Sequence, residues 1–298
     1  MTLKGALLAG LALVGVAFTA VWVRVARRHP FARPGPAHLG IGWLTDFLDT
    51  LGIGSFATTT TAFRLGRLVD DRKIPGTLNV GHTLPTIVQA LIYITIVDVD
   101  AVTLASLVAA SVLGAVLGAG IVVKLPLRGI RGVMGVALIL AGALMAGSAL
   151  SVLPKGGDAL SLSGTKLVVG IVANGVLGAL MTAGIGLYGP CMVLVALLGM
   201  SPAAAFPIMM GSCAFLMPSA SFRFLREGAY DGTAALGLTL AGIFGVLVAA
   251  YVVRSLPLDV LRILVLGVVL YTAVTLLVAA SKDDAAPVKA PRESNEDR

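Results

Sequence analysis

Thr50-Leu-Gly-Ile-Gly-Ser-Phe56 recurs 132 residues later in the chain as Thr182-Ala-Gly-Ile-Gly-Leu-Tyr188. Further matching residues are spaced 131 apart: Asp100 and Asp231, Gly114 and Gly245, Leu125-Pro-Leu127 and Leu256-Pro-Leu258, and Arg131 and Arg262. One match would be expected by chance in so apolar a chain, but a constant spacing over two whole halves indicates a duplication. The sequence therefore predicts two repeats, at residues 38–152 and 166–281.

The chain around both stretches is strongly apolar. Of its 298 residues, 57% are hydrophobic and 12% are charged, whereas a soluble domain carries about 25% charged residues. A helix of ~20 apolar residues spans a bilayer, and uncharged segments close to that length recur at 5–23, 74–97, 101–123, 132–153, 201–222, 232–253 and 263–281. Polar and apolar residues do not alternate as they would in an outer-membrane barrel. We therefore expect an all-α integral membrane protein.

The regions outside the repeats complete the expected organisation. Residues 1–37 are predicted to form an N-terminal transmembrane helix and a basic cytoplasmic loop, because arginines follow the apolar segment where a signal peptide would have small residues. Residues 153–165 connect the repeats. Residues 282–298 mix both charge signs with Pro and Ser, which is typical of a short disordered tail.

Each repeat opens with a segment that its glycines interrupt. Residues 167–200 are uncharged, too long for one helix and too short for two full spans. If such a segment returns to the side from which it enters, each repeat crosses the membrane three times and the second is inverted. Four basic clusters then face the cytoplasm, as the positive-inside rule requires: 24–33, 64–73, 124–131 and 223–226. We therefore expect two inverted-topology repeats, each of three spans plus a glycine-broken helical hairpin.

Two runs in the first repeat, residues 46–57 and 73–85, resemble the TauE/SafE family of membrane permeases. Their echoes in the second repeat, residues 184–190 and 206–213, resemble it as well. The resemblance depends on glycine-rich breaks at matching places in the two halves. It implies a multi-pass carrier in the cytoplasmic membrane for small sulfur-containing anions such as sulfite or organosulfonates.

The matched glycine breaks indicate where an anion would bind. In inverted-repeat transporters, broken helices place half-helix N-termini near the bilayer midplane, and the free N–H groups and helix dipole there attract anions. Tight helix packing is the alternative role for such glycines, and hydrogen bonding between helices is the alternative for the nearby polar residues. The substrate-binding candidates are Gly52, Gly54, Ser55, Thr58, Asn79, His82, Gly184, Gly186, Tyr188 and Ser212.

Asp46 and Asp49 lie three residues apart on one face of an apolar segment, just before the first break. A carboxylate at the bilayer centre costs on the order of 3 kcal/mol, so each needs a partner, a proton or a wet cavity. We expect the pair to couple transport to protons. The alternatives are an ion pair with Arg64 or Arg67, or an interfacial position. The second repeat has Asn174 near these positions, so coupling would be asymmetric.

These features favour a transporter that exports a small anion by alternating access. A membrane about 100 mV negative inside gives a monoanion ~2.3 kcal/mol of outward drive, whereas uptake would need cotransported cations. A passive anion channel is one alternative, and a membrane enzyme or assembly factor without transport activity is another. The sequence does not identify the substrate or the coupling ion, and it leaves homo-oligomerisation open.

Other functional classes lack their sequence signatures. The net charge of +7 is explained by basic cytoplasmic loops and does not indicate nucleic-acid binding. His29, His38 and His82 are scattered, and Cys191 and Cys213 have no CxxC spacing, so no metal site is expected. No HExxH, GxSxG or phosphate-cradling motif indicates an enzyme or a cofactor. The expected partners are the lipid bilayer and a small anionic substrate.

Overall fold

The structure is a computed structural model and describes residues 2–152, 156–184 and 186–251, with single positions between 270 and 281. The described secondary structure is helical, apart from one isolated bridge between Ala159 and Met200. Most of the expected span at 263–281, and all of the expected tail at 282–298, lie outside the described residues.

Ten helices are described, and the two glycine stretches lie in connections between them. The first half contains α1 (Leu3–Arg28), α2 (Pro36–Thr50), α3 (Ser55–Gly66), α4 (Ile74–Ile96), α5 (Ala101–Val122) and α6 (Leu127–Ala149). The second half contains α7 (Gly164–Met181), α8 (Tyr188–Leu197), α9 (Pro202–Glu227) and α10 (Gly232–Tyr251). The first glycine stretch separates α2 from α3, and the second separates α7 from α8.

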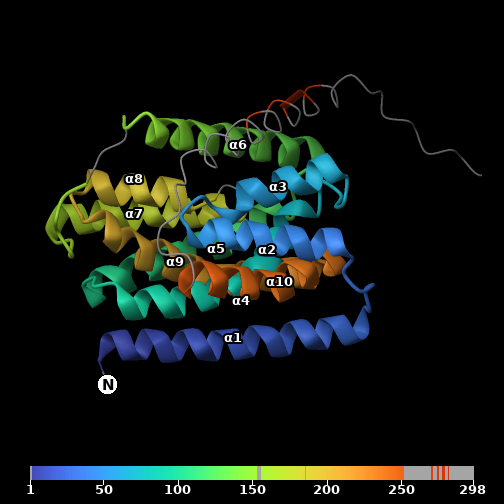
Figure 1. Cartoon of the computed structure of the whole chain (residues 1–298), viewed down its shortest axis with the longest axis horizontal. Helices are drawn as coiled ribbons and strands as arrows, with labels where there is room; N and C mark the ends of the chain where they lie inside the picture. Colours follow the sequence, from blue (N-terminus) through green and yellow to red (C-terminus); the bar gives the residue numbers. More distant parts are fainter. Residues whose placement is uncertain are drawn as a thin grey trace, which may run out of the picture.

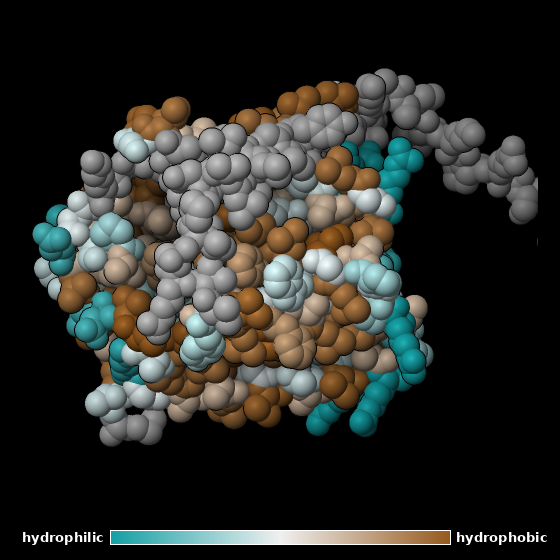
Figure 2. All heavy atoms as spheres, viewed as in Figure 1, coloured by the Kyte–Doolittle hydropathy of each residue, from teal (hydrophilic) through white to brown (hydrophobic). Residues whose placement is uncertain are grey.

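Six of the described helices, α1, α5, α6, α7, α9 and α10, are long and apolar enough to cross a membrane. Helix α4 has 23 residues but carries Asn79, His82 and Gln89, which are fully buried and face other helices. Hydrophobic side chains form a broad band between more hydrophilic ends of the molecule (Figure 2). The chain is therefore a multi-pass integral membrane protein.

The two halves exchange packing partners. Helix α2 lies along α10 of the other half, α7 lies along α5, and α4 packs against α9 (Figure 1). Small residues permit both exchanged contacts, because helices in lipid associate through close approach of their backbones. A Cβ at Gly114 would lie 1.8 Å from the Gly175 carbonyl oxygen, and one at Gly245 would lie 2.3 Å from the Trp43 carbonyl oxygen. Residues that the duplication pairs in sequence thus take the same places in the two contacts.

The two broken hairpins start at opposite ends of the bundle. At one end, Asp231 N–H donates to Thr77 Oγ1 at 2.8 Å; at the other, Asp100 N–H donates to the Leu160 carbonyl at 2.9 Å. Helix α2 begins near the first of these ends and α7 near the second (Figure 1). Inverted repeats require such an arrangement. The two-fold relation between the halves and the repeat boundaries stay predictions.

Helix α1 lies at the edge of the bundle, against α4 and α9 (Figure 1). Its buried residues are Leu11, Gly15, Phe18 and Trp22, which follow the spacing of one helical face. The rest of α1 is exposed or half-buried, as expected for a helix that faces lipid on most sides. It supports the bundle without contributing to the interior site.

Candidate anion and proton site

Both hairpins are broken by glycines in a backbone conformation that other residues rarely adopt. Between α2 and α3, Gly52 and Gly54 have φ angles of 86° and 90°. Between α7 and α8, Gly184 has a φ of 97°, while Ile185 lies outside the described residues. Glycine reaches positive φ at no steric cost. The chain can therefore end one helix and begin the next within a few residues.

The two breaks meet at one buried cavity of about 20 Å³. The cavity is lined by Gly54, Ser55 and Phe56 from the first break, Gly186, Leu187 and Tyr188 from the second, and Asp49, Thr86, Met181, Cys213 and Met217 from the surrounding helices. A Cβ at Gly186 would lie 3.8 Å from Phe56 Cβ, which shows how closely the breaks approach. A single water needs roughly 10–15 Å³. The cavity therefore has room for at least a water-sized group.

Asp49 occupies the N-terminus of α3. Its Oδ1 accepts a hydrogen bond from Ser55 N–H, whereas its Oδ2 has no hydrogen-bond partner among the described residues. The residue is 2% exposed and lines the cavity. A carboxylate is stabilised at a helix N-terminus by the free N–H groups and the dipole. The first of the two N-termini at the breaks therefore already holds a carboxylate of the chain.

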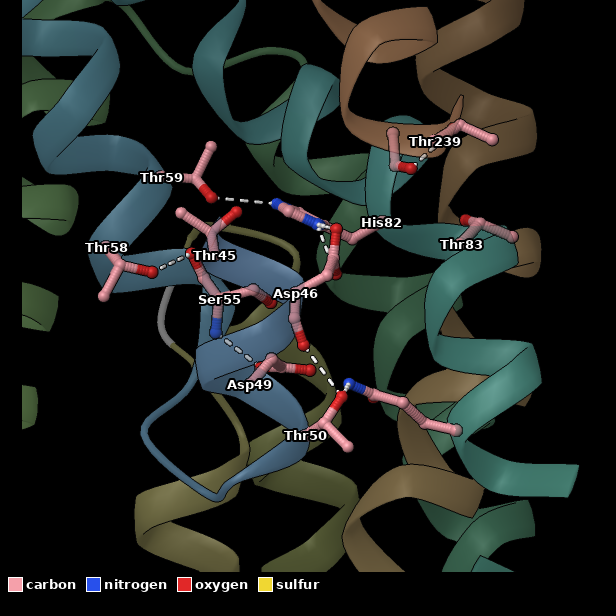
Figure 3. A network of polar contacts seen from close by, with 12 residues as sticks. Thr45, Asp46, Asp49, Thr50, Ser55, Thr58, Thr59, His82, Thr83 and Thr239 are labelled. Carbon is pink, nitrogen blue, oxygen red and sulfur yellow. Dashed lines mark hydrogen bonds and ion pairs between the residues drawn. The ribbon is translucent and has the colours of Figure 1, made fainter. Parts of the chain in front are cut away.

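Asp46 pairs with His82 of α4 (Figure 3). The imidazole Nδ1 lies 2.9 and 3.0 Å from the two carboxylate oxygens of Asp46, and Nε2 lies 3.0 Å from Thr59 Oγ1. All three side chains are fully buried. Helix α10 leaves room for the pair, because a Cβ at Gly242 would lie 2.1 Å from Asp46 Oδ2. A carboxylate and an imidazole in contact can share and transfer a proton.

In the described part of the chain, neither Asp46 nor Asp49 forms the ion pair with Arg64 or Arg67 that was considered from the sequence. Arg64 pairs with Asp71, and Arg131 of α6 pairs with the same carboxylate at 2.9 Å. This cluster lies beyond the end of α3, a helix length away from the break. Both aspartates at the break are buried within the protein; the interfacial position considered from the sequence stays an alternative.

A second hydrogen-bonded chain connects the two breaks through α4. The Tyr188 hydroxyl donates to Gln89 Oε1 at 2.7 Å, and Gln89 Nε2 donates to Thr50 Oγ1 at 2.8 Å. Thr50 in turn donates to the Asp46 carbonyl at 2.8 Å. Thr50 was not among the site candidates. The position of Thr50 directly before the break was the one sequence signal for it.

Several candidates lie away from the cavity. Thr58 Oγ1 bonds back to the Gly54 and Ser55 carbonyls, as threonines in helices commonly do. Asn79 bonds to the Pro75 carbonyl at 2.8 Å. A Cβ added at Gly52 would meet Phe206 at 3.7 Å, and one at Gly184 would meet Met134 at 3.6 Å. Ser212 Oγ accepts a hydrogen bond from Asn174 Nδ2 at 2.9 Å. Of the ten substrate-binding candidates, the structure thus brings together Gly54, Ser55, Gly186 and Tyr188 at the cavity, with His82 bonded to Asp46 behind it.

The site contains hydrogen-bond donors, two carboxylates and one imidazole. Within the described residues, no group of three or more His, Cys, Asp or Glu side chains could hold a metal ion. Cys191 and Cys213 are buried and free. The arrangement can therefore bind an anion at a helix N-terminus and hold a proton on the carboxylate and imidazole groups.

Fold and site together define a multi-pass helical membrane protein with paired helix breaks. A family model described as Sulfite exporter TauE/SafE matches residues 154–296. The resemblance to the TauE/SafE family that the sequence predicted is thereby confirmed over the second half of the chain. No curated protein and no solved structure matches the chain.

Proposed function

We propose that this protein carries a small sulfur-containing anion, such as sulfite or an organosulfonate, out across the cytoplasmic membrane by alternating access. The observation that carries the proposal is the meeting of two glycine breaks, one from each half, at a single buried cavity. The match to the sulfite exporter model supports the substrate class. The family is one of transporters, which argues against an enzyme.

The N-terminus of α8 is the proposed anion site. Its N-cap residue Leu187 makes no side-chain cap hydrogen bond, and Leu187 and Tyr188 line the cavity. Free N–H groups and the positive end of the helix dipole favour an anion there without any cationic side chain. Glycine at position 186 allows the anion to approach the backbone closely.

The size of the cavity favours a carrier mechanism. At about 20 Å³ the cavity is small, so we expect the packing around the breaks to open when the substrate enters. Opening first to one side and then to the other is alternating access, which in inverted-repeat folds occurs around a fixed site between the halves. A passive channel would need a continuous path instead.

The Asp46–His82 pair is the proposed proton site. Both groups are fully buried and bonded to each other, so a proton added to or removed from the pair changes its charge in a medium where charge is costly. Outward movement of a monoanion is already driven by ~2.3 kcal/mol per 100 mV. A coupled proton would add the pH gradient to that driving force.

Flux measurements in proteoliposomes test the proposal. The purified chain is reconstituted, and sulfite, thiosulfate, sulfonates and carboxylates are compared for initial rates at an imposed membrane potential. We expect saturable flux of sulfite or sulfonates that exceeds the flux of carboxylates. Flux that rises linearly with concentration would indicate a channel, and absence of flux for every sulfur anion would refute the transport proposal.

A further inference from the structure

The N-termini at the two breaks differ in one respect. At α3 the Ser55 N–H is occupied by Asp49 Oδ1, so the chain supplies its own anion. At α8 the N-cap residue Leu187 makes no cap hydrogen bond, and no side chain of the described residues is found to accept from the first N–H groups of the helix. Both N-termini face the same cavity. A substrate with one anionic group therefore has one place for that group.

The second oxygen of Asp49 is the unusual feature of the cavity. Oδ2 is buried and has no hydrogen-bond partner among the described residues. Gln89 and Tyr188 lie close enough to Asp49 to interact with it electrostatically, but the Tyr188 hydroxyl donates to Gln89 Oε1 and Gln89 Nε2 donates to Thr50 Oγ1. A buried polar atom without a partner is costly, and more so when it is charged. The cavity thus presents the Asp49 Oδ2 acceptor beside the N–H donors of α8.

We propose that Asp49 selects substrates, so that the carried anion is one that brings its own hydrogen-bond donor. The anionic group binds at the N-terminus of α8, and a hydroxyl group of the same molecule donates to Asp49 Oδ2. An anion without a donor would leave Oδ2 unsatisfied and would place its own charge next to a carboxylate at short range. This inference rests on the proposed function and assigns to Asp49 a specificity role instead of a proton-carrying one.

A protonated Asp49 would behave in the opposite way. Its Oδ2–H would donate to the oxyanion itself, and a donor on the substrate would then bring no advantage. The two possibilities therefore differ in a measurable selectivity. The test compares 2-hydroxyethanesulfonate with propane-1-sulfonate, which have equal charge and equal numbers of heavy atoms and differ by a hydroxyl in place of a methyl group.

Both sulfonates are tested in proteoliposomes that contain the full chain, as substrates and as competitors of sulfite flux. A hydrogen bond to a charged group corresponds to about a tenfold change in affinity, so we expect wild-type protein to prefer the hydroxyl compound by about tenfold. Asp49→Asn keeps an oxygen for Ser55 N–H but replaces Oδ2 by an amide donor, so the preference should vanish or reverse. Asp100→Asn is the matched control, because Asp100 caps α5 outside the cavity and should leave the preference unchanged.

The wild-type ratio alone decides the inference if Asp49→Asn does not fold. Equal handling of the two sulfonates, or exclusion of both while sulfite crosses, overturns the role of Asp49 and leaves sulfur-anion transport standing. Absence of flux for sulfite and for both sulfonates overturns the proposed function instead. A preference that persists in Asp49→Asn would also show that another residue selects the hydroxyl group.

Discussion

The same interhelical contact is built differently in the two halves. In the first, α2 places Asp46 against Gly242 of α10, and the carboxylate reaches His82. In the second, α7 places Gly178 against Ser111 of α5, where a Cβ at Gly178 would lie 2.1 Å from the Ser111 carbonyl oxygen. By the spacing of the duplication, Gly178 corresponds to Asp46 and Ser111 to Gly242. The larger residue of the contact is thus on α2 in the first half, but on α5, the partner of α7, in the second.

A neutral bond takes the place of the ionisable pair in the second half. Asn174, one turn before Gly178, donates to Ser212 at 2.9 Å, and Ser212 is the counterpart of His82. The breaks differ in the same sense, since Asp49 caps α3 and no side chain caps α8. The two halves share this helix packing, but only the first half has ionisable side chains at these positions. The comparison suggests that the first half handles protons and selectivity and the second half binds the anion.

Of the substitutions predicted for the two halves, Gly242→Val should destabilise the protein most. Gly242→Val would place side-chain atoms onto the Asp46 carboxylate and against Pro85. Overpacking of this kind costs about 1–3 kcal/mol, and more where the neighbours cannot move, so we expect a large loss of stability. Melting temperature and yield in detergent provide the measurement. Gly120→Val on α5, where a Cβ meets nothing within 4 Å, is the control and should fold; a stable Gly242→Val variant would contradict this packing.

Valine in place of a glycine should impair transport at either break, but it should also lower stability only at the first break. Gly186→Val has a Cβ with room, 3.8 Å from Phe56, but its branches would fill the cavity, so transport should fall more than tenfold with little change in melting temperature. Gly54→Val should lose transport and also stability, because a residue with a Cβ at a φ of 90° is strained by about 1–3 kcal/mol. Normal flux in both variants would reduce the breaks to helix packing.

Asp46→Asn should abolish any stimulation of flux by a pH gradient. The asparagine can keep a hydrogen bond to His82 but cannot exchange a proton, so the rate should become independent of the gradient while the protein remains folded. Ser212→Ala removes the equivalent neutral bond in the second half and should retain the stimulation. If Asp46→Asn collapses on purification and His82→Gln does so too, the pair is structural.

The sequence predicted the elements of this molecule better than the contacts between them. The duplicated glycines and the uncharged segments are local patterns, so the breaks and most of the helices could be read directly. The partner of Asp46 could not, because His82 lies 36 residues away and many helix arrangements would have been compatible with the same pattern. Arg64 was wrongly considered as a partner of Asp46 or Asp49. It pairs with Asp71, which lies in a basic loop and is not marked by the sequence as its partner.

The capping of α3 by Asp49 was missed for a physical reason as well. An i, i+6 contact forms only because Gly52 and Gly54 turn the chain back on itself, and the spacing alone suggests a residue on the same helical face as Asp46. Two further candidates lie outside the cavity for a similar reason. Thr58 Oγ1 and Asn79 Nδ2 donate to carbonyl oxygens of their own helix or its first turn, a choice that sequence spacing does not reveal.

The smallest expected effect concerns the ends of the two hairpins. In the first half, Asp71 receives both Arg64 and Arg131, at 9%, 19% and 22% side-chain exposure; in the second, Lys166 Nζ donates to the Leu198 carbonyl at 3.0 Å. Partly exposed ion pairs contribute about 1 kcal/mol or less, so Asp71→Asn should lower the melting temperature by only a few degrees. The difference from wild type should shrink in 1 M salt, where the Debye length is about 3 Å.

Lys166→Met removes one hydrogen bond to a neutral carbonyl, and its effect should depend less on salt. An equal salt response in both variants would mean that the two hairpin ends are held by the same kind of contact, and that the difference in charge between the halves is confined to the breaks.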